Sequence, residues 1–220
     1  MSTVNETIEY NEQLSQYVRN LFVVEDKTLQ QIRERAPKEN LPPHDINSEE
    51  GRFLQLLVRA CDARKAVEFG TLAGYSSIWI ARGLAPGGKL FTFEKEQNCV
   101  DIAKENFAKA DVTGKVEVLC GDAHTLVESL APKGPFDFVF IDAEKTGYIS
   151  YFDWAVQNTR VGGFIVAHNA FLHRTILDFD TDDEGVKAMQ MFHKHVASEP
   201  RVMGSVFPAG DGTVVTVKIA

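Results

Sequence analysis

Cysteine is scarce in this 220-residue chain, and its three cysteines, Cys61, Cys99 and Cys120, lie far apart among apolar neighbours. An odd number of widely spaced cysteines argues against a disulfide framework and against a zinc site. We therefore interpret them as buried, reduced thiols. Reduced thiols are typical of the cytoplasm, which is where we expect the protein to act.

Long apolar runs are also lacking, and residues 1–10 are polar and acidic. The sequence therefore predicts neither a signal peptide nor a transmembrane helix, and we expect no membrane partner. Clusters of basic residues are lacking too. Over the whole chain, 31 acidic residues outnumber 23 basic ones and give a net charge of -8. Because nucleic acid is densely negative, this balance disfavours nucleic acid as the main partner.

Hydrophobic residues make up 44% of the chain, which suffices for the core of one domain. We expect a single domain over residues 1–220, with a helical cover and linker at 1–46 and a ligand-binding core at 47–220. Two short amphipathic helices are predicted before a linker marked by Pro42 and Pro43. We interpret these helices as a cover over the sheet, with a substrate lid or a dimer contact as alternatives. We expect a homodimer.

The core begins with a capping box, in which Asn47 and Glu50 open a helix. Beyond it, strand-like and helix-like segments alternate, which predicts a doubly wound, mostly parallel α/β sheet with helices on both faces. Two alternating segments at 202–207 and 213–219, joined by a loop with two glycines, predict an antiparallel C-terminal hairpin at one sheet edge. The other predicted strands are 67–69, 90–93, 116–120, 136–142 and 164–168, and the helices between and after them are 78–84, 99–110, 126–130, 151–158 and 185–197.

The first predicted strand of the core runs into a glycine turn. The strand breaks at Gly70, the chain turns through Gly74, and a helix opens with Ser76. Gly70 permits a sharp exit from the strand, Gly74 lets a ligand approach the backbone, and helix N–H groups near Ser76 favour an anionic group. The G-x-x-x-G spacing differs from the G-x-G-x-x-G of dinucleotide-binding proteins, which disfavours a nicotinamide or flavin nucleotide. The alternative is a turn with a purely structural role.

Acidic residues close the next two strands, at the edge where open α/β sheets bind ligands. Glu94 follows Gly70 by 24 residues, where a carboxylate can accept both hydroxyls of a ribose. Asp122 can accept the amine of a base while the Ala123 N–H faces a ring nitrogen. The alternatives are a helix N-terminal acid for Glu94 and a turn aspartate for Asp122.

Three further polar residues, Asp142, His168 and Asn169, close neighbouring predicted strands. Because the carboxyl ends of parallel strands meet at one edge, we expect these side chains to converge. A mixed oxygen and nitrogen set of this kind can hold a divalent cation, while the alternative is a pair of loop caps.

Taken together, these motifs resemble the cation-dependent O-methyltransferases, the family that contains catechol and caffeoyl-coenzyme A O-methyltransferases. The resemblance runs from about residue 47 to the C-terminus and implies a seven-stranded, Rossmann-like methyltransferase fold that binds S-adenosylmethionine. The motifs that carry it are EFGTLAGYS at 68–76, GDA at 121–123, FDFVFIDAEK at 136–145, Tyr148 and Tyr151, two glycines at 162–163, and FPAGDG at 207–212.

The resemblance also implies a role for each matching residue. Gly70 and Gly74 would frame S-adenosylmethionine, Ser76 would bind its carboxylate, and Glu94 its ribose. The full cofactor-binding set that it implies is Glu68, Gly70, Gly74, Ser76, Glu94, Asp122, Ala123 and Asp142.

At the reacting end, the resemblance makes Lys145 the catalytic base and Asp142 a catalytic metal ligand, with His168 and Asn169 completing the metal set. Most relatives have Asp-Asn where this chain has His168-Asn169. An imidazole in place of a carboxylate disfavours Mg²⁺ and favours Mn²⁺, Co²⁺ or Zn²⁺. The alternative is that no cation is bound and His168 acts as a base or hydrogen-bond donor.

The implied activity is metal-assisted methyl transfer from S-adenosylmethionine to a hydroxyl of a small catechol-like or other vicinal-diol aromatic molecule. A cation bound by both hydroxyls would lower the pKa of the phenol, and Lys145 would take the proton. The first alternative is methylation of a hydroxylated wobble uridine in tRNA. The second is a non-catalytic nucleotide-binding α/β protein.

Overall fold

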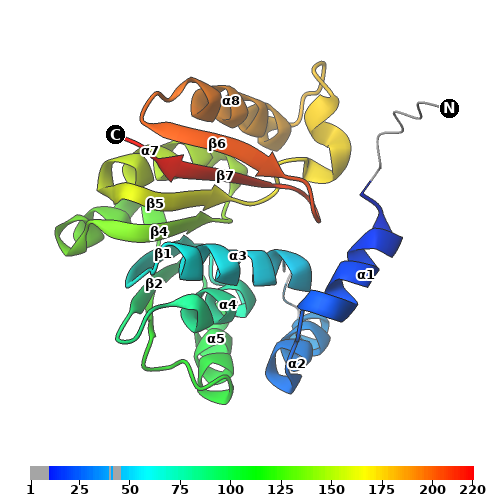
Figure 1. Ribbon diagram of the computed structural model, residues 1–220, viewed down its shortest axis with the longest axis vertical. Coiled ribbons are helices and arrows are strands. Elements are labelled where there is room, and N and C mark those ends of the chain that lie inside the picture. Colours follow the sequence, from blue (N-terminus) through cyan, green and yellow to red (C-terminus); the bar gives the residue numbers. More distant parts are fainter. Residues whose placement is uncertain (1–9, 40, 42–45) are drawn as a thin grey trace, which may run out of the picture.

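The computed structural model describes residues 10–39, 41 and 46–220, so the predicted linker prolines Pro42 and Pro43 lie outside the described residues. Its centre is a seven-stranded sheet in the order β3-β2-β1-β4-β5-β7-β6 (Figure 1). The strands are β1 (Lys65–Phe69), β2 (Lys89–Glu94), β3 (Val116–Cys120), β4 (Phe136–Ile141), β5 (Thr159–Ala167), β6 (Val202–Phe207) and β7 (Thr213–Lys218). The first five strands are parallel, and β7 runs antiparallel between β5 and the edge strand β6. The predicted sheet and hairpin are confirmed.

Helices cover both faces of this sheet (Figure 1). One face packs against α3 (Ser48–Ala60), α4 (Tyr75–Gly83) and α5 (Gln97–Lys109), and the other against α7 (Tyr148–Asn158) and α8 (Glu184–Ser198). The predicted helix at 126–130 is wrong in its bounds, because α6 (Ala123–Leu126) ends there and a 3-10 helix, η2 (Val127–Lys133), follows. Pro132 within that segment lacks the N–H that an α-helix needs.

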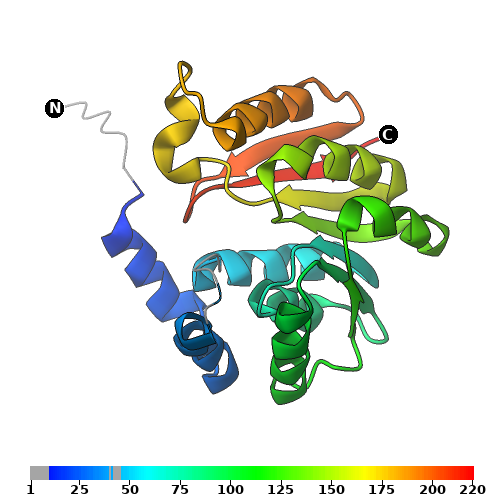
Figure 2. The same ribbon diagram turned by 180° about the vertical axis from the view of Figure 1, so that it is seen from behind.

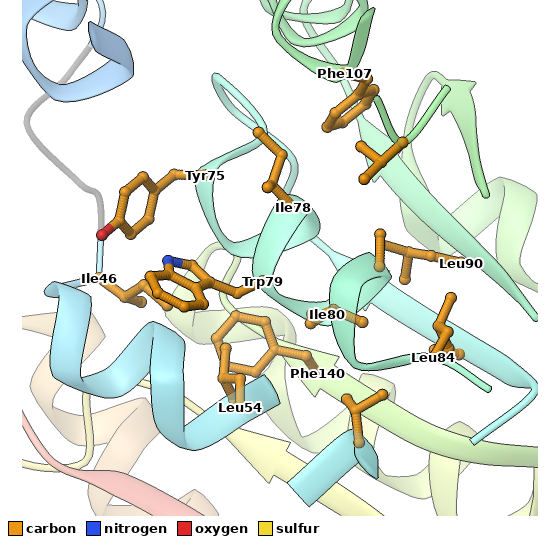
Figure 3. Packing of buried hydrophobic residues seen from close by; sticks show 14 of the residues in the cluster. Ile46, Leu54, Tyr75, Ile78, Trp79, Ile80, Leu84, Leu90, Phe107 and Phe140 are labelled. Atoms are coloured by element: carbon orange, nitrogen blue, oxygen red, sulfur yellow. The ribbon is translucent and has the colours of Figure 1, made fainter. Parts of the chain in front are cut away.

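Alternating residues of β1 divide the core into two apolar clusters. Ala66 belongs to the cluster under α3, α4 and α5, while Val67 and Phe69 belong to the cluster under α7 and α8. This division follows from the two-residue period of a strand. In the first cluster, Trp79 packs between Tyr75 and Leu54, as Figure 3 shows.

The N-terminal helices α1 (Glu12–Phe22) and α2 (Lys27–Arg35) lie beside the ends of α3 and α4, away from the sheet (Figures 1 and 2). Ser15 Oγ on α1 donates to Glu49 of α3 at 2.8 Å, and Arg82 of α4 pairs with Asp26 just before α2. Leu29 and Ile32 of α2 are also buried in the apolar cluster on the side of the sheet that α3, α4 and α5 cover. The N-terminal helices therefore pack on that helical layer, and their role as a cover stays a prediction. No helix in the described part of the chain is long and apolar enough to cross a membrane.

Candidate active site

A cavity of about 1280 Å³ opens at the carboxyl ends of strands β1 to β5. Parallel strands bring their carboxyl ends to one edge, so residues far apart in the sequence share its wall. Most of the predicted site residues line it, namely Gly70, Ser76, Glu94, Asp122, Ala123, Asp142, Lys145, His168 and Asn169. Glu68 and Gly74 are not among the lining residues.

Close backbone packing explains both glycines of the turn. Gly70 has φ +98°, and a Cβ there would lie 2.1 Å from the carbonyl oxygen of Asp142. Gly74 has φ +83°, and a Cβ there would lie 2.4 Å from the ring of Phe107. Phe107 of α5 therefore gives Gly74 a packing role as well, and its role beside a ligand stays a prediction.

Glu68 is fully buried in β1 beneath the first turn of α4. Its carboxylate accepts hydrogen bonds from Ser76 Oγ at 2.6 Å, from Thr92 Oγ1 at 2.7 Å and from Ser77 Oγ. Burial raises the pKa of Glu68 to about 7, although these hydroxyls oppose the shift. Glu68 therefore positions Ser76 at the cavity wall and does not line the cavity itself.

Glu94 ties the end of β2 to the glycine turn. Its Oε2 accepts a hydrogen bond from the Leu72 N–H at 2.8 Å, and its Oε1 accepts one from the Glu96 N–H at 2.9 Å. Leu72 has φ +48°, a conformation that a non-glycine residue adopts at some cost. Each carboxylate oxygen keeps further lone-pair capacity that can serve a ligand in the cavity.

Asp122 caps α6, because its Oδ1 accepts the His124 N–H at 2.9 Å. The turn interpretation of Asp122 is therefore correct, and the same residue also lines the cavity next to Ala123. His124 continues this wall, where its ring stacks on Tyr151 with centroids 4.5 Å apart. Glu144 Oε1 accepts a hydrogen bond from Tyr151 Oη at 2.6 Å and lies 2.9 Å from His124 Nε2.

Lys145 lies at the centre of the polar end of the cavity. Its Nζ donates to Asn169 Oδ1 at 2.6 Å and to Tyr148 Oη at 2.7 Å, and lies 3.5 Å from Asp142 Oδ1. Burial lowers the pKa of Lys145, and the nearby Asp142 carboxylate opposes that shift. Burial would raise the pKa of Asp142, but the positive charges of His168 and Lys145 outweigh it and lower that pKa.

His168 is buried at the end of β5 between two carboxylates. Its Nε2 lies 3.0 Å from Glu50 Oε1, and its Nδ1 lies 3.3 Å from Asp142 Oδ2 without the alignment of a hydrogen bond. Burial disfavours the charged ring, but Asp142 and Glu50 outweigh burial and raise the pKa of His168 to about 10.

Glu50 is a site residue that was not predicted from the sequence, because its only local signal is the capping box with Asn47. That capping box is present, with the Asn47 N–H donating to Glu50 Oε2 at 2.9 Å. No local pattern predicts the second contact, because Glu50 and His168 are 118 residues apart.

Comparison with known proteins agrees with this geometry. A family model described as O-methyltransferase matches residues 19–219. The chain belongs to the O-methyltransferase family. The identification from the motifs is confirmed, and so is the predicted enzyme class, an S-adenosylmethionine-dependent O-methyltransferase.

Relatives and solved structures support that assignment over most of the chain. A catechol O-methyltransferase of Niastella koreensis is 33% identical over 197 residues, which cover 89% of each chain. One of Mycobacterium tuberculosis is 36% identical over 182 residues, 81% of this chain and 82% of the relative. The structure of a Bacillus cereus O-methyltransferase in complex with SAH has a TM-score of 0.87 at 36% identity and covers 94% of this chain and 97% of that chain. That of TomG from Streptomyces achromogenes in complex with SAM has a TM-score of 0.88 at 32% identity, with 94% and 96% covered.

The cation expected for this methyltransferase can be tested against the donor atoms. In the described residues, no group of three His, Cys, Asp or Glu side chains is arranged to hold a metal ion. A mixed set does fit, because the buried Nδ1 of His168 has no hydrogen-bond partner and faces Asp142 Oδ2. The Asn169 oxygen, which accepts from Lys145, has a second lone pair and can serve as the third donor.

Proposed function

We propose that this methyltransferase transfers the methyl group of S-adenosylmethionine to one hydroxyl of a small aromatic molecule with two vicinal hydroxyls. The observation that carries the proposal is that one cavity joins the glycine turn and Glu94 to a partly buried lysine beside Asp142. The catechol O-methyltransferases among its relatives support an acceptor of this class.

The methyl donor would lie along the ends of β1, β2 and β3. Its carboxylate would face the N-terminus of α4 near Ser76, where helix N–H groups point outward. Glu94 would accept the ribose hydroxyls with its remaining lone pairs, and Asp122 with Ala123 would contact the adenine. Gly70 and Asp142 would form the wall between this donor and the acceptor.

The acceptor hydroxyl would lie next to Lys145. A phenol with a pKa near ~10 is mostly protonated at neutral pH, so transfer needs a group that takes its proton. Burial favours the neutral amine of Lys145, whose Nζ can accept that proton. The phenolate oxygen then forms a bond to the methyl carbon as the carbon–sulfur bond of the sulfonium breaks, which leaves a neutral thioether.

Asp142, His168 and Asn169 would hold the divalent cation that the family implies. Such an ion, when bound, lowers the pKa of the phenol and fixes the position of both hydroxyls. The chain itself positions the base, because Tyr148 and Asn169 both accept hydrogen bonds from the Lys145 amine.

We also propose a cytoplasmic homodimer. The three cysteines are free, which supports a reducing compartment. The interpretation that all three are buried is wrong, because only Cys99 is buried, Cys61 is half-buried and Cys120 is exposed. Large apolar side chains on α1, including Tyr17, Leu21 and Phe22, are more than half exposed, which supports a contact with a second copy. Light scattering of the purified protein measures the oligomeric state, and a monomeric mass would contradict the dimer.

The decisive experiment is incubation with isotopically labelled S-adenosylmethionine and a panel of catechols, with products identified by mass spectrometry. We expect labelled monomethyl ethers from the catechols and far less product from matched monophenols. Equal methylation of the monophenols would overturn the vicinal-diol proposal, and labelled nucleosides from tRNA in a parallel reaction would favour the tRNA alternative.

A further inference from the structure

The buried pair of Glu50 and His168 adds a contact that the expected metal ligands alone do not explain. Glu50 is 3% exposed and His168 is 5% exposed, and they come from α3 and from the end of β5. A carboxylate and an imidazole withdrawn this far from water need each other as partners. Glu50 therefore holds the ring of His168 through Nε2, while Nδ1 faces Asp142 Oδ2.

We propose that Glu50 is a positioning residue that presents His168 Nδ1 as a nitrogen ligand, so that the site selects a first-row transition-metal ion over Mg²⁺. This inference rests on the proposed metal-assisted function. It extends that function by adding Glu50 and by giving His168 a defined nitrogen for the ion.

The direction of the Glu50 contact determines which nitrogen is available. Glu50 accepts the Nε2–H of His168, so the lone pair of a neutral ring lies on Nδ1. An ion beside Asp142 would accept this Nδ1 lone pair. Metal-binding histidines commonly donate their other N–H to a carboxylate in this way.

The distance between the two donor atoms is consistent with a shared ion. Ligands at right angles on an ion about 2.1 Å away lie about 3.0 Å apart. His168 Nδ1 and Asp142 Oδ2 are 3.3 Å apart. Mg²⁺ prefers oxygen donors, whereas the affinity of a site with a nitrogen donor rises along the first-row ions from Mn²⁺ to Co²⁺. A nitrogen at this position therefore favours Co²⁺ most and Mn²⁺ less strongly over Mg²⁺.

Glu50 is fixed firmly enough to orient the ring. Its Oε2 accepts the Asn47 N–H in the capping box of α3, which leaves Oε1 for His168. On the other side, the backbone at Gly210 packs so closely that a Cβ there would lie 2.4 Å from the Glu50 carboxyl carbon. The carboxylate therefore has little room to turn away from His168.

The test is calorimetric titration of Mn²⁺, and separately of Mg²⁺, into the full-length protein after chelation, without methyl acceptor. We expect the wild type to bind Mn²⁺ more tightly than Mg²⁺, and Glu50→Gln to weaken Mn²⁺ binding by roughly 10- to 100-fold. Glu49→Gln is the matched control, because Glu49 is also buried on α3 but bonds Ser15 and Tyr10. We expect this control to bind Mn²⁺ like the wild type.

A second variant keeps the inference testable if Glu50→Gln does not fold. His168→Asp should lower the ratio of Mn²⁺ to Mg²⁺ affinity, and the ligand-field absorption of the Co²⁺-loaded protein should change as nitrogen is replaced by oxygen. An unchanged ratio, or unchanged Mn²⁺ affinity in folded Glu50→Gln, would overturn the inference.

Methylation of catechol by the chelated wild type separates this inference from the proposed function. If the wild type binds no Mn²⁺ yet still methylates catechol, the metal inference fails and methyl transfer stands. If Mn²⁺ binds as expected but no catechol is methylated, the acceptor proposal fails and the role of Glu50 stands.

Discussion

Glu94 is the residue whose replacement tests the donor site most directly. In Glu94→Ala, two sets of hydrogen bonds disappear: those proposed to the ribose hydroxyls, and those that hold the Leu72 and Glu96 N–H groups. A hydrogen bond to a charged group contributes about 1.5–3 kcal/mol, and two such bonds are not fully additive, so we expect a loss of about 2–4 kcal/mol. That loss corresponds to roughly 30- to 700-fold weaker binding.

Calorimetric titration with S-adenosylhomocysteine measures this change, and two further variants separate its causes. Glu94→Gln keeps one acceptor oxygen for the Leu72 N–H, so it should preserve the turn and lose the charge. Glu96→Ala removes a neighbouring exposed acid whose backbone N–H alone contacts Glu94, so we expect wild-type affinity. Binding by Glu94→Ala within about twofold of the wild type would remove Glu94 from the donor site.

Three further predictions concern proton transfer, pH and the turn. Lys145→Met should lower kcat by roughly 10²- to 10⁴-fold with little change in S-adenosylhomocysteine affinity. The control is Lys133→Met, which removes a lysine that pairs with Glu117. A near-normal kcat for Lys145→Met would show that another group takes the proton. Glu68 has a folded pKa raised to about 7 from 4.5, so the folded state holds the extra proton and its stability falls as pH rises through that range. Glu68→Gln should flatten this slope of up to ~1.4 kcal/mol per pH unit in urea unfolding, and equal slopes would contradict the assignment. Gly74→Ala should destabilise the fold by about 2–4 kcal/mol, because it adds left-handed strain and a clash with Phe107. Gly87→Ala has a similar φ of +75° with open space around it, so equal losses of thermal stability in the two variants would show that Phe107 does not matter.

The succession of strands and helices along the chain, and the sheet edge that carries the site, could be predicted from the sequence. A strand alternates side chains with a period of two, a helix with a period near 3.6, and these periods are local. Alternating strands and helices predict a parallel sheet, and parallel strands must bring Gly70, Glu94, Asp122 and Asp142 to one edge. Residue type and position after a strand therefore suffice to assemble the wall of the cavity.

The role of each residue in and around that wall depends on contacts that no local pattern encodes. Gly70 is needed because the Asp142 carbonyl passes beside it, and Gly74 because Phe107 does. Glu68 bonds Ser76 because the glycine turn brings the first turn of α4 back over the end of β1.

The contact between His168 and Glu50 shows most clearly what the sequence does not predict. Glu50 follows Asn47 by three residues, and from this spacing the sequence predicts the capping box. Its second contact exists because α3 begins beside the carboxyl end of β5, and His168 is 118 residues further along the chain. Hydrogen bonds between buried groups form wherever the packed elements bring donor and acceptor together, so only the tertiary structure decided that His168 would bond Glu50 and lie beside Asp142.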